Sequence, residues 1–295
     1  MRNHLLVSAL FAVTTLHAQN LSPLSVDPPS DSSNPASLVE IAVPSHGAQL
    51  LGALYLAVGA QAHPTALIFH GFPGYEQNLD LAQTLRRAGY NVLAVHYRGS
   101  WGVSGTFSYQ HSIEDVDAEV AWITSAEVAA KYHVDPKRVV VIGHSLGGYL
   151  ALSAAAHNSN VAAVVSISGA SLGHRFAGLK PEDKDAAVAK AAGRIDPTDL
   201  LPLVGTSATA LSGEVFDHRD DWDFLKLAPA LGKRPVLLLT ANDGTGPNSE
   251  ALLEALKAQG DTQTLHTEFK TDHPFSDHRI ALQEAILNWL GEYIH

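Results

Sequence analysis

A serine stands between two glycines at the point where residues 138–158 change from an apolar strand to a helix. Residues 139–142 (VVVI) are a β-branched run typical of a buried strand. Residues 149–157 are rich in alanine and leucine, which favour a helix. The bare pattern Gly-x-Ser-x-Gly arises by chance in roughly one chain in ten of this length. It is therefore the strand before the motif and the helix after it that predict a sharp strand-to-helix turn at residues 143–148 (GHSLGG).

The composition is that of a globular protein with an ample core. Of the 295 residues, 46% are hydrophobic and 17% are charged. A net charge of −11 without a basic cluster in the sequence argues against nucleic acid and anionic membrane surfaces as partners. The chain has no cysteine, which excludes disulfides, thiol nucleophiles, thiolate metal sites and a lipid anchor.

The first residues have the pattern of an export signal. A short polar start with Arg2 precedes an apolar run, residues 5–16, that is too short to span a bilayer. We expect residues 1–18 to be a cleaved signal peptide and the protein to be periplasmic or secreted, without stable membrane insertion after cleavage. Leu16 occupies a place where signal peptidases prefer a small residue, so an uncleaved anchor is the alternative.

The rest of the chain predicts one α/β domain. Residues 19–37, rich in Pro, Ser, Asn and Asp, are expected to be a flexible linker to a domain at residues 38–295. An antiparallel pair of strands comes first, and apolar strands then alternate with amphipathic helices, including one long helix over residues 112–132. This alternation predicts a mainly parallel sheet of about eight strands with helices on both faces.

One connection is far longer than the others. About 60 residues separate two strands where two to six are usual, which predicts a helical cap inserted at about residues 172–232. Phe216 and Trp222 of this insertion, with Tyr75 and Trp101, are expected to form a wall of the substrate pocket. Packing of the aromatic residues within the cap itself is the alternative.

Ser145 is the predicted nucleophile. A serine hydroxyl reacts poorly by itself and needs a base, an acid that orients the base, and donors for the developing oxyanion. Gly143 and Gly147 leave room for a tight turn that exposes the hydroxyl at a helix N-terminus. A serine that only caps the helix is the alternative, and it leaves the two glycines unexplained.

Residues 70–74 (HGFPG) follow another apolar strand and predict an open loop. The N–H groups of Phe72 and Leu146 can then converge on one point and form an oxyanion hole. We expect His70 to fix this loop by hydrogen bonds. A plain turn that closes the strand is the alternative.

Two strand ends offer the remaining groups. Asp243 ends an apolar strand on the edge where open α/β sheets bind ligands, although an aspartate serving only the turn is the alternative. Pro274 keeps His273 in an extended loop, whereas His278 is expected inside the final helix. His273 is therefore favoured as the base, and His266 lies within the preceding strand.

No metal or cofactor site is predicted. The 16 histidines show no metal-ligand spacing. The acidic residues Asp217, Asp220, Asp221 and Asp223 are interpreted as a solvated face of the cap.

Ser145, Asp243 and His273 follow the order Ser…Asp…His on successive strand ends, and in this the chain resembles the α/β-hydrolase superfamily. The resemblance covers residues 38–295 and implies an α/β-hydrolase fold. It implies Ser145 as nucleophile, His273 as general base and Asp243 as its orienting acid. Residues 70–105 also resemble single-domain relatives of acylaminoacyl peptidases and small bacterial esterases, although the chain has no room for the β-propeller of those peptidases.

These features predict an exported serine hydrolase that cleaves small carboxylic esters through an acyl-enzyme. A peptidase or amidase of the acylaminoacyl-peptidase type is the first alternative. A catalytically inactive α/β-hydrolase fold used for binding is the second, and such a module has no need of all three residues.

Overall fold

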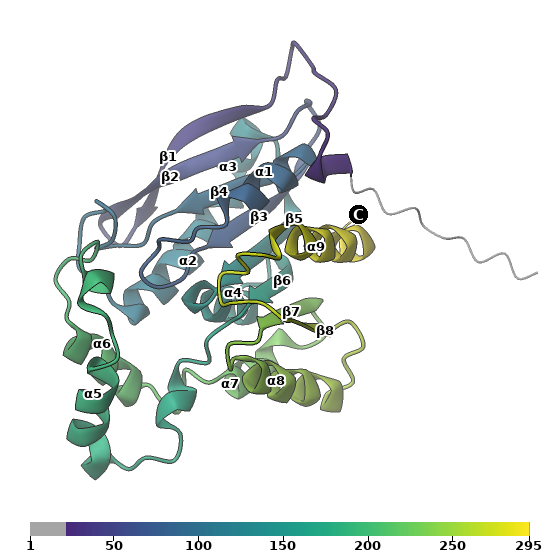
Figure 1. The fold of residues 1–295 in the computed structure, drawn as a ribbon. Coiled ribbons are helices and arrows are strands. Elements are labelled where there is room, and N and C mark those ends of the chain that lie inside the picture. The colour runs from purple at the N-terminus through teal and green to yellow at the C-terminus, as the bar shows by residue number, and fades with distance from the viewer. Residues whose placement is uncertain (1–21, 295) are drawn as a thin grey trace, which may run out of the picture.

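The structure is a computed structural model that describes residues 22–294, so the expected signal peptide lies outside the described residues. Within them, one eight-stranded sheet has the order β1-β2-β4-β3-β5-β6-β7-β8 (Figure 1). β2 pairs antiparallel with β1 and β4, and every other neighbouring pair is parallel, as expected. The strands are β1 (Ser37–Ser45), β2 (Ala48–Leu56), β3 (His63–Phe69), β4 (Asn91–Val95), β5 (Val134–His144), β6 (Val161–Ile167), β7 (Val236–Ala241) and β8 (Leu265–Phe269).

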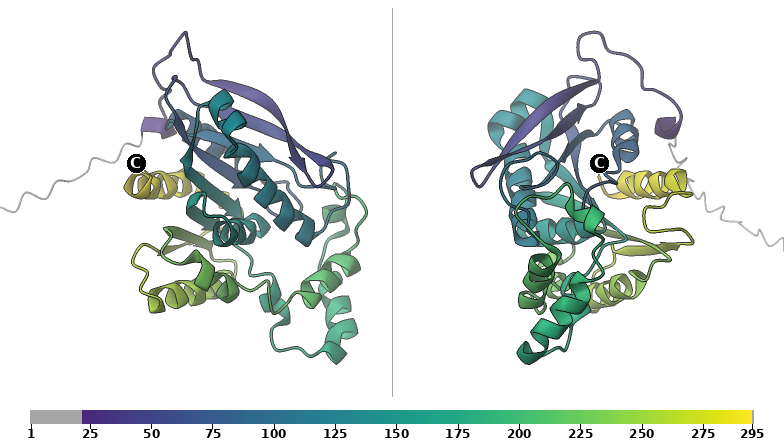
Figure 2. Two further views of the ribbon diagram at one scale, coloured as in Figure 1. Left: turned by 180° about the vertical axis from the view of Figure 1, so that it is seen from behind. Right: turned by 60° about the vertical axis from the view of Figure 1, so that its left-hand side comes forward.

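Helices cover both faces of the sheet (Figure 2). On β5, Val139 and Val141 pack towards α2, α4 and α8, whereas Val140 and Ile142 pack towards α1 and α9. The fully apolar run of β5 thus serves two cores, as a central parallel strand requires. The helices are α1 (Leu79–Arg87), α2 (Tyr109–Ile123), α3 (Ala126–Tyr132), α4 (Leu146–His157), α5 (Lys184–Ala192), α6 (Ala208–Asp217), α7 (Phe224–Leu231), α8 (Gly246–Ala258) and α9 (Arg279–Tyr293).

The prediction of a single helix over residues 112–132 is wrong, because α2 and α3 are separate helices. The hydroxyl of Thr124 donates to the Val120 carbonyl at 2.7 Å, and Ser125 adopts an extended conformation (φ −62°, ψ 144°). A serine or threonine side chain that bonds the backbone offers the chain an alternative to the helix. The polar pair Thr124-Ser125 therefore ends one helix and begins the next.

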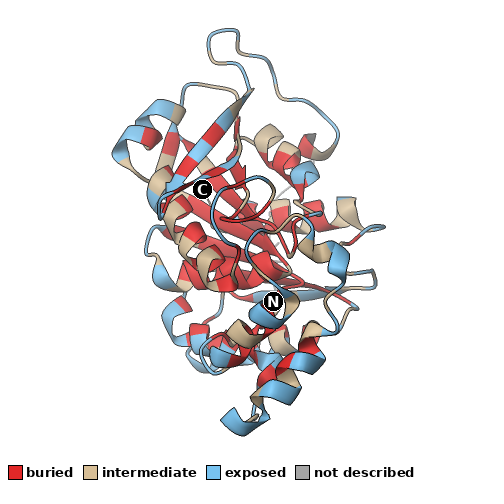
Figure 3. Ribbon diagram, turned by 90° about the vertical axis from the view of Figure 1, so that its left-hand side faces the viewer, coloured by how far each residue is buried: buried red, intermediate tan, exposed pale blue. Residues whose placement is uncertain are grey.

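The long connection between β6 and β7 is helical, as expected. It contains α5, α6 and α7 together with short 3-10 turns. α5 and α6 pack on each other and stand away from the sheet, whereas α7 packs against α4 and α8 (Figures 1 and 2). The central strands of the sheet are buried, and the outer sides of α5 and α6 are exposed (Figure 3). The part of the insertion that overhangs the sheet is therefore the α5–α6 pair.

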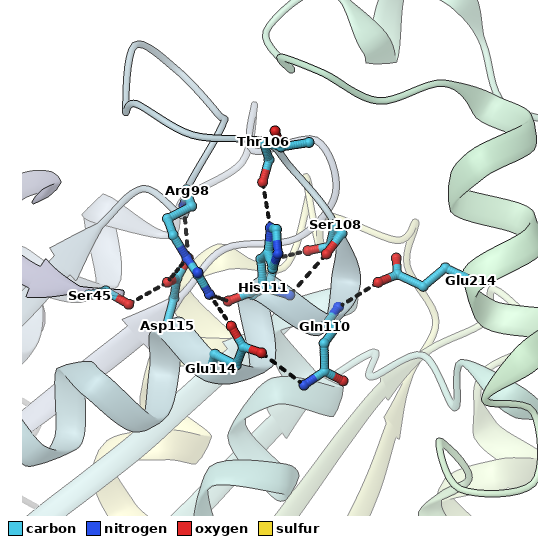
Figure 4. A network of polar contacts seen from close by, with 10 residues as sticks. Ser45, Arg98, Thr106, Ser108, Gln110, His111, Glu114, Asp115 and Glu214 are labelled. Carbon is cyan, nitrogen blue, oxygen red and sulfur yellow. Dashed lines mark hydrogen bonds and ion pairs between the residues drawn. The ribbon is translucent and has the colours of Figure 1, made fainter. Parts of the chain in front are cut away.

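Polar contacts tie this cap to the N-terminus of α2 (Figure 4). Glu214 of α6 accepts hydrogen bonds from the backbone N–H groups of Tyr109 and Gln110 at 2.9 and 3.0 Å. A carboxylate is favoured there, because the first N–H groups of a helix have no partner inside it. Behind this contact, Arg98 binds the fully buried Asp115 of α2 at 2.6 Å. The cap is thus anchored to the body through the first turn of α2.

The segment before β1 lies against the same body. Ser22–Leu24 form a 3-10 turn beside α1 and α9, and the Pro23 carbonyl accepts a hydrogen bond from Arg87 at 2.5 Å. Across residues 22–294, we find no helix with the length and apolar character needed to cross a bilayer.

Candidate active site

Ser145 occupies the turn between β5 and α4 in a strained conformation. Its φ of 57° and ψ of −117° lie in a region that non-glycine residues rarely adopt. A Cβ atom on Gly143 would collide with the Gly147 carbonyl, and one on Gly147 would collide with the Phe69 carbonyl. The two glycines are therefore needed for the close approach of backbone that lets this turn form beside β3.

The loop that follows β3 lies directly against Ser145. A Cβ atom on Gly71 would lie 3.0 Å from the Cβ of Ser145. Phe72 and Leu146 line the same cavity as Ser145. Neither of their backbone N–H groups has a hydrogen-bond acceptor within residues 22–294. Two unpaired donors thus flank the serine, as an oxyanion hole requires.

Asp243 and His273 form a hydrogen-bonded pair at the neighbouring strand ends. His273 Nδ1 lies 2.6 Å from Asp243 Oδ2. Asp243 Oδ1 accepts from the backbone N–H of Thr245 at 2.9 Å and from its hydroxyl at 2.6 Å. Burial acts to raise the pKa of Asp243, but these hydrogen bonds outweigh it and lower the pKa below its ordinary value. Asp243 is therefore a carboxylate at neutral pH that fixes the orientation of the His273 ring.

His144 links this pair to the serine. Its Nε2 donates to the His273 carbonyl at 2.9 Å, and the two rings lie 4.7 Å apart between centroids. His144 directly precedes Ser145, so the contact brings the His273 loop to the serine turn. Among the described residues, no hydrogen bond joins Ser145 Oγ to His273, and such catalytic bonds often tighten only when substrate binds.

The other histidines lie apart from Asp243. His278 is the residue before α9, not inside the helix as expected, and its Nδ1 contacts Asp277 at 2.8 Å. His266 lies in β8 and contacts the hydroxyl of Thr240 at 2.8 Å. His70 is fully buried and bonds the Gly71 carbonyl at 2.7 Å, which holds the loop after β3 in place.

A cavity of about 950 Å³ opens above Ser145, and Asp243 reaches it as well. Its apolar walls come from the body and from the cap together. Tyr109 enters from the first turn of α2, and Phe72 from the loop after β3. The insertion between β6 and β7 supplies Leu172, Phe176, Leu179 and Ile195.

The aromatic residues expected from the insertion lie behind this wall. Phe216 is only 1% exposed and packs edge-on against Phe176, with ring centroids 5.3 Å apart. Trp222 is 5% exposed and packs in the same way against Tyr109 at 6.5 Å. Both are outside the cavity lining, because their own burial in the cap places another aromatic ring between them and the cavity.

Tyr75 and Trp101 are also outside the lining. The Tyr75 side chain is exposed, and its hydroxyl donates to the Thr198 carbonyl at 3.2 Å. Trp101 Nε1 donates to the Pro73 carbonyl at 2.7 Å. These two residues join the loops around the site instead of facing the cavity.

The sequence patterns did not identify Thr245 and His144, which position Asp243 and His273. Thr245 follows Asp243 by two residues, which is the spacing of an Asx turn and was a usable signal. His144 had no such signal, because its partner lies 129 residues further along the chain.

No cluster of three or more histidine, aspartate or glutamate side chains arranged to hold a metal occurs within residues 22–294. Asp217 instead pairs with Lys184 at 2.6 Å, and Asp223 caps α7 by accepting from the N–H of Leu225 at 2.8 Å.

Two of the buried histidines, His70 and His144, predict a loss of stability in mild acid. Burial lowers the pKa of His144 from 6.5 to about 4 and that of His70 from 6.5 to about 3. Between these values and 6.5 the unfolded chain binds protons that the folded chain does not, so the free energy of unfolding falls as the pH falls. For His144, this effect lowers the free energy of unfolding at pH 5 by about 2 kcal/mol relative to neutral pH.

Urea unfolding at several pH values measures this effect. The His144→Gln variant is expected to lose less stability than the wild type between neutral pH and pH 5, because one of the two histidines is gone. The exposed His157 serves as the control, and His157→Gln is expected to follow the wild-type curve. Parallel curves for His144→Gln and the wild type would contradict the assignment.

Comparison with known proteins points to one family. A family model described as "Alpha/beta hydrolase family" matches residues 66–282, well over half of the chain. No curated protein sequence matches the chain.

Several solved structures share the fold. An esterase from Pyrobaculum calidifontis is 19% identical, with 89% of this chain and 88% of that chain covered and a TM-score of 0.62. A thermostable carboxylesterase cloned from a metagenomic library is 20% identical, with 93% of each chain covered and a TM-score of 0.60. The acylaminoacyl peptidase of Pyrococcus horikoshii is 17% identical, with a TM-score of 0.62, and 88% of this chain matches 42% of that one. At these identities the likeness shows the fold alone.

Proposed function

This chain belongs to the alpha/beta hydrolase family, and we propose that it is an exported serine hydrolase that cleaves carboxylic esters through an acyl-enzyme. One observation carries the proposal. The strained turn of Ser145 and the Asp243 carboxylate, which is hydrogen-bonded to His273, line one cavity of about 950 Å³. Strain of this kind at a single serine is typical of a functional position.

The proposed reaction assigns one task to each residue. Ser145 Oγ attacks the ester carbonyl while His273 Nε2 takes its proton, and Asp243 stabilises the imidazolium that forms. The N–H groups of Phe72 and Leu146 bind the oxyanion of the tetrahedral intermediate. His273 then returns the proton to the leaving alcohol, and the acyl group stays on Ser145. A water molecule, deprotonated by His273, releases the carboxylic acid and restores the serine.

The cap supports an ester in preference to an extended peptide. Tyr109, Phe176 and Leu179 enclose the space above Ser145 on several sides. A walled cavity lined by both apolar and polar side chains suits a small or medium-sized substrate. The fold is shared with an acylaminoacyl peptidase as well as with esterases. The test therefore has to distinguish cleavage of amides from cleavage of esters.

Export is part of the proposal and is supported by the amino-acid sequence. Arg2 and the apolar run of residues 5–16 have the order of a signal peptide. Protein recovered from outside the cytoplasm is expected to begin after residue 18, which N-terminal sequencing reads directly.

A panel of nitrophenyl esters and aminoacyl nitroanilides tests the reaction. We expect purified protein to hydrolyse the esters with saturation kinetics and a burst of nitrophenol where deacylation is slow. We expect much lower kcat/KM values on the anilides. Faster anilide than ester cleavage would make the protein a peptidase or amidase, and no turnover on either class would indicate a binding protein.

A further inference from the structure

Three cationic side chains line the cavity that holds Ser145. Arg175 comes from the 3-10 turn Gly173–Phe176, Lys190 from the last turn of α5, and Arg194 from the residues just after α5. All three are exposed and lie along the cap side of the cavity. The chain has 19 lysines and arginines and a net charge of −11. The presence of three cationic side chains around one cavity of such an acidic protein therefore calls for an explanation.

No partner within the described residues neutralises these cations. The side chains of Arg175, Lys190 and Arg194 form no ion pair and no hydrogen bond within residues 22–294. Two other cations of the insertion are engaged, since Lys184 binds Asp217 at 2.6 Å and Arg219 donates to the Phe216 carbonyl at 2.8 Å.

The carboxylates of the cavity do not satisfy these cations either. Asp243 is committed to His273 and Thr245. Asp199 is the other carboxylate in the lining, and neither it nor any other acidic side chain described lies within ion-pair distance of the three cations. The helix dipole of α5 favours a cation at Lys190, but Arg175 belongs to a different element, so the dipole does not explain why they converge.

We propose that the natural substrate is an ester that carries an anionic group on an apolar chain, and that Arg175, Lys190 and Arg194 bind this group. The inference rests on the proposed ester hydrolysis at Ser145. Leu172, Phe176 and Leu179 would contact the apolar chain. Arginine and lysine would bind the anionic end by charge-assisted hydrogen bonds. The three cations come from the cap, whereas the scissile carbonyl would lie at Ser145 in the body of the protein.

Matched substrates test the proposal. The anionic probe is the nitrophenyl monoester of adipic acid, whose far end is a carboxylate, and the neutral probe is nitrophenyl hexanoate. We expect a lower KM for the anionic probe, by roughly tenfold, because a charge-assisted contact in a partly enclosed site contributes about that factor. Added salt is expected to raise the KM of the anionic probe and not that of the neutral one.

A second pair of probes asks on which side of the ester the charge belongs. The acetyl ester of hydroxybenzoate carries the carboxylate on the leaving group, whereas the adipate monoester carries it on the acyl group. Phenyl acetate is the neutral match for the former. Preference for either anionic member over its neutral match supports the proposal and fixes the orientation.

Variants assign the effect to two of the three cations. Arg194→Gln and Lys190→Met are each expected to raise the KM for the anionic probe by roughly three- to tenfold and to leave the neutral probe within about twofold. The matched control is Lys184→Gln, which removes the same charge from the same helix outside this cavity. It is expected to leave the ratio between the two probes unchanged.

The outcomes separate this inference from the proposed function. Equal KM values for the anionic and the neutral member within both pairs of probes, or equal losses on both members in the variants, would overturn the inference and leave the esterase proposal standing. If the protein hydrolyses none of the esters, calorimetry still measures the binding of hexanoate and of hexanol. Hexanoate binding that is lost in Arg194→Gln would then still support the anion site, and equal binding of the two probes would reject it.

Discussion

Replacement of Ser145 by alanine is expected to abolish ester hydrolysis, with a fall in kcat of about 10⁵- to 10⁶-fold. The reason is that, among the described residues, Ser145 is the only serine or threonine that lines the cavity shared with Leu146 and Asp243. A fluorophosphonate probe is expected to add once per wild-type chain and not at all to Ser145→Ala. Initial rates and intact-protein mass spectrometry measure the two effects.

The structure supplies a control for that experiment. Alanine at position 145 has to adopt the same positive φ as the serine, so the variant is expected to keep the wild-type melting temperature within the scatter of the measurement. Ser276→Ala removes an exposed hydroxyl from the loop after β8 and is expected to keep full activity and labelling. Undiminished labelling of Ser145→Ala would mean that the nucleophile lies elsewhere.

The turn at Ser145 could be predicted because its cause is local. Gly143 and Gly147 lie within two residues of the serine, and the apolar strand and alanine-rich helix adjoin them. The same reasoning placed Asp243 at a strand end and His273 in a loop, since parallel strands end at one edge of the sheet. Local pattern and topology together were sufficient to predict where each of these three residues lies in the fold.

The cavity wall could not be predicted, because it is made by contacts between distant segments. Tyr109 and Phe176 face the cavity, while Trp222 and Phe216 pack behind them. An aromatic residue in a helical insertion has the same sequence signal in either place. Which ring faces the cavity depends on how α6 docks on the first turn of α2, where Glu214 binds the helix N-terminus.

The cations of the cap illustrate the same limit. In the sequence Arg175 lies 15 residues before Lys190, so no basic cluster is visible there. The cluster forms only when the 3-10 turn at Arg175 and the end of α5 meet at the cavity. The net charge of −11 is the reason to expect no nucleic-acid partner, yet it does not describe the electrostatic potential inside one cavity.

Replacement of His273 by alanine is expected to lower kcat by roughly 10⁴- to 10⁶-fold, as loss of the base does in this chemistry. The histidine removes the proton that would otherwise stay on the Ser145 hydroxyl. Asp243→Asn is expected to lower kcat by about 10⁴-fold, because an amide does not stabilise the imidazolium at 2.6 Å as the carboxylate does. Initial rates on nitrophenyl esters measure both losses.

His278 is the matched control, because it lies five residues further along the same loop and also contacts an aspartate. Its Nδ1 binds Asp277 at 2.8 Å, but Asp277 is exposed and, unlike Asp243, does not line the cavity. His278→Ala is therefore expected to change kcat by less than about threefold, as surface substitutions do. If His278→Ala were the inactive variant and His273→Ala the active one, the base would be His278, and the bond between Asp243 and His273 would serve only to fold the loop.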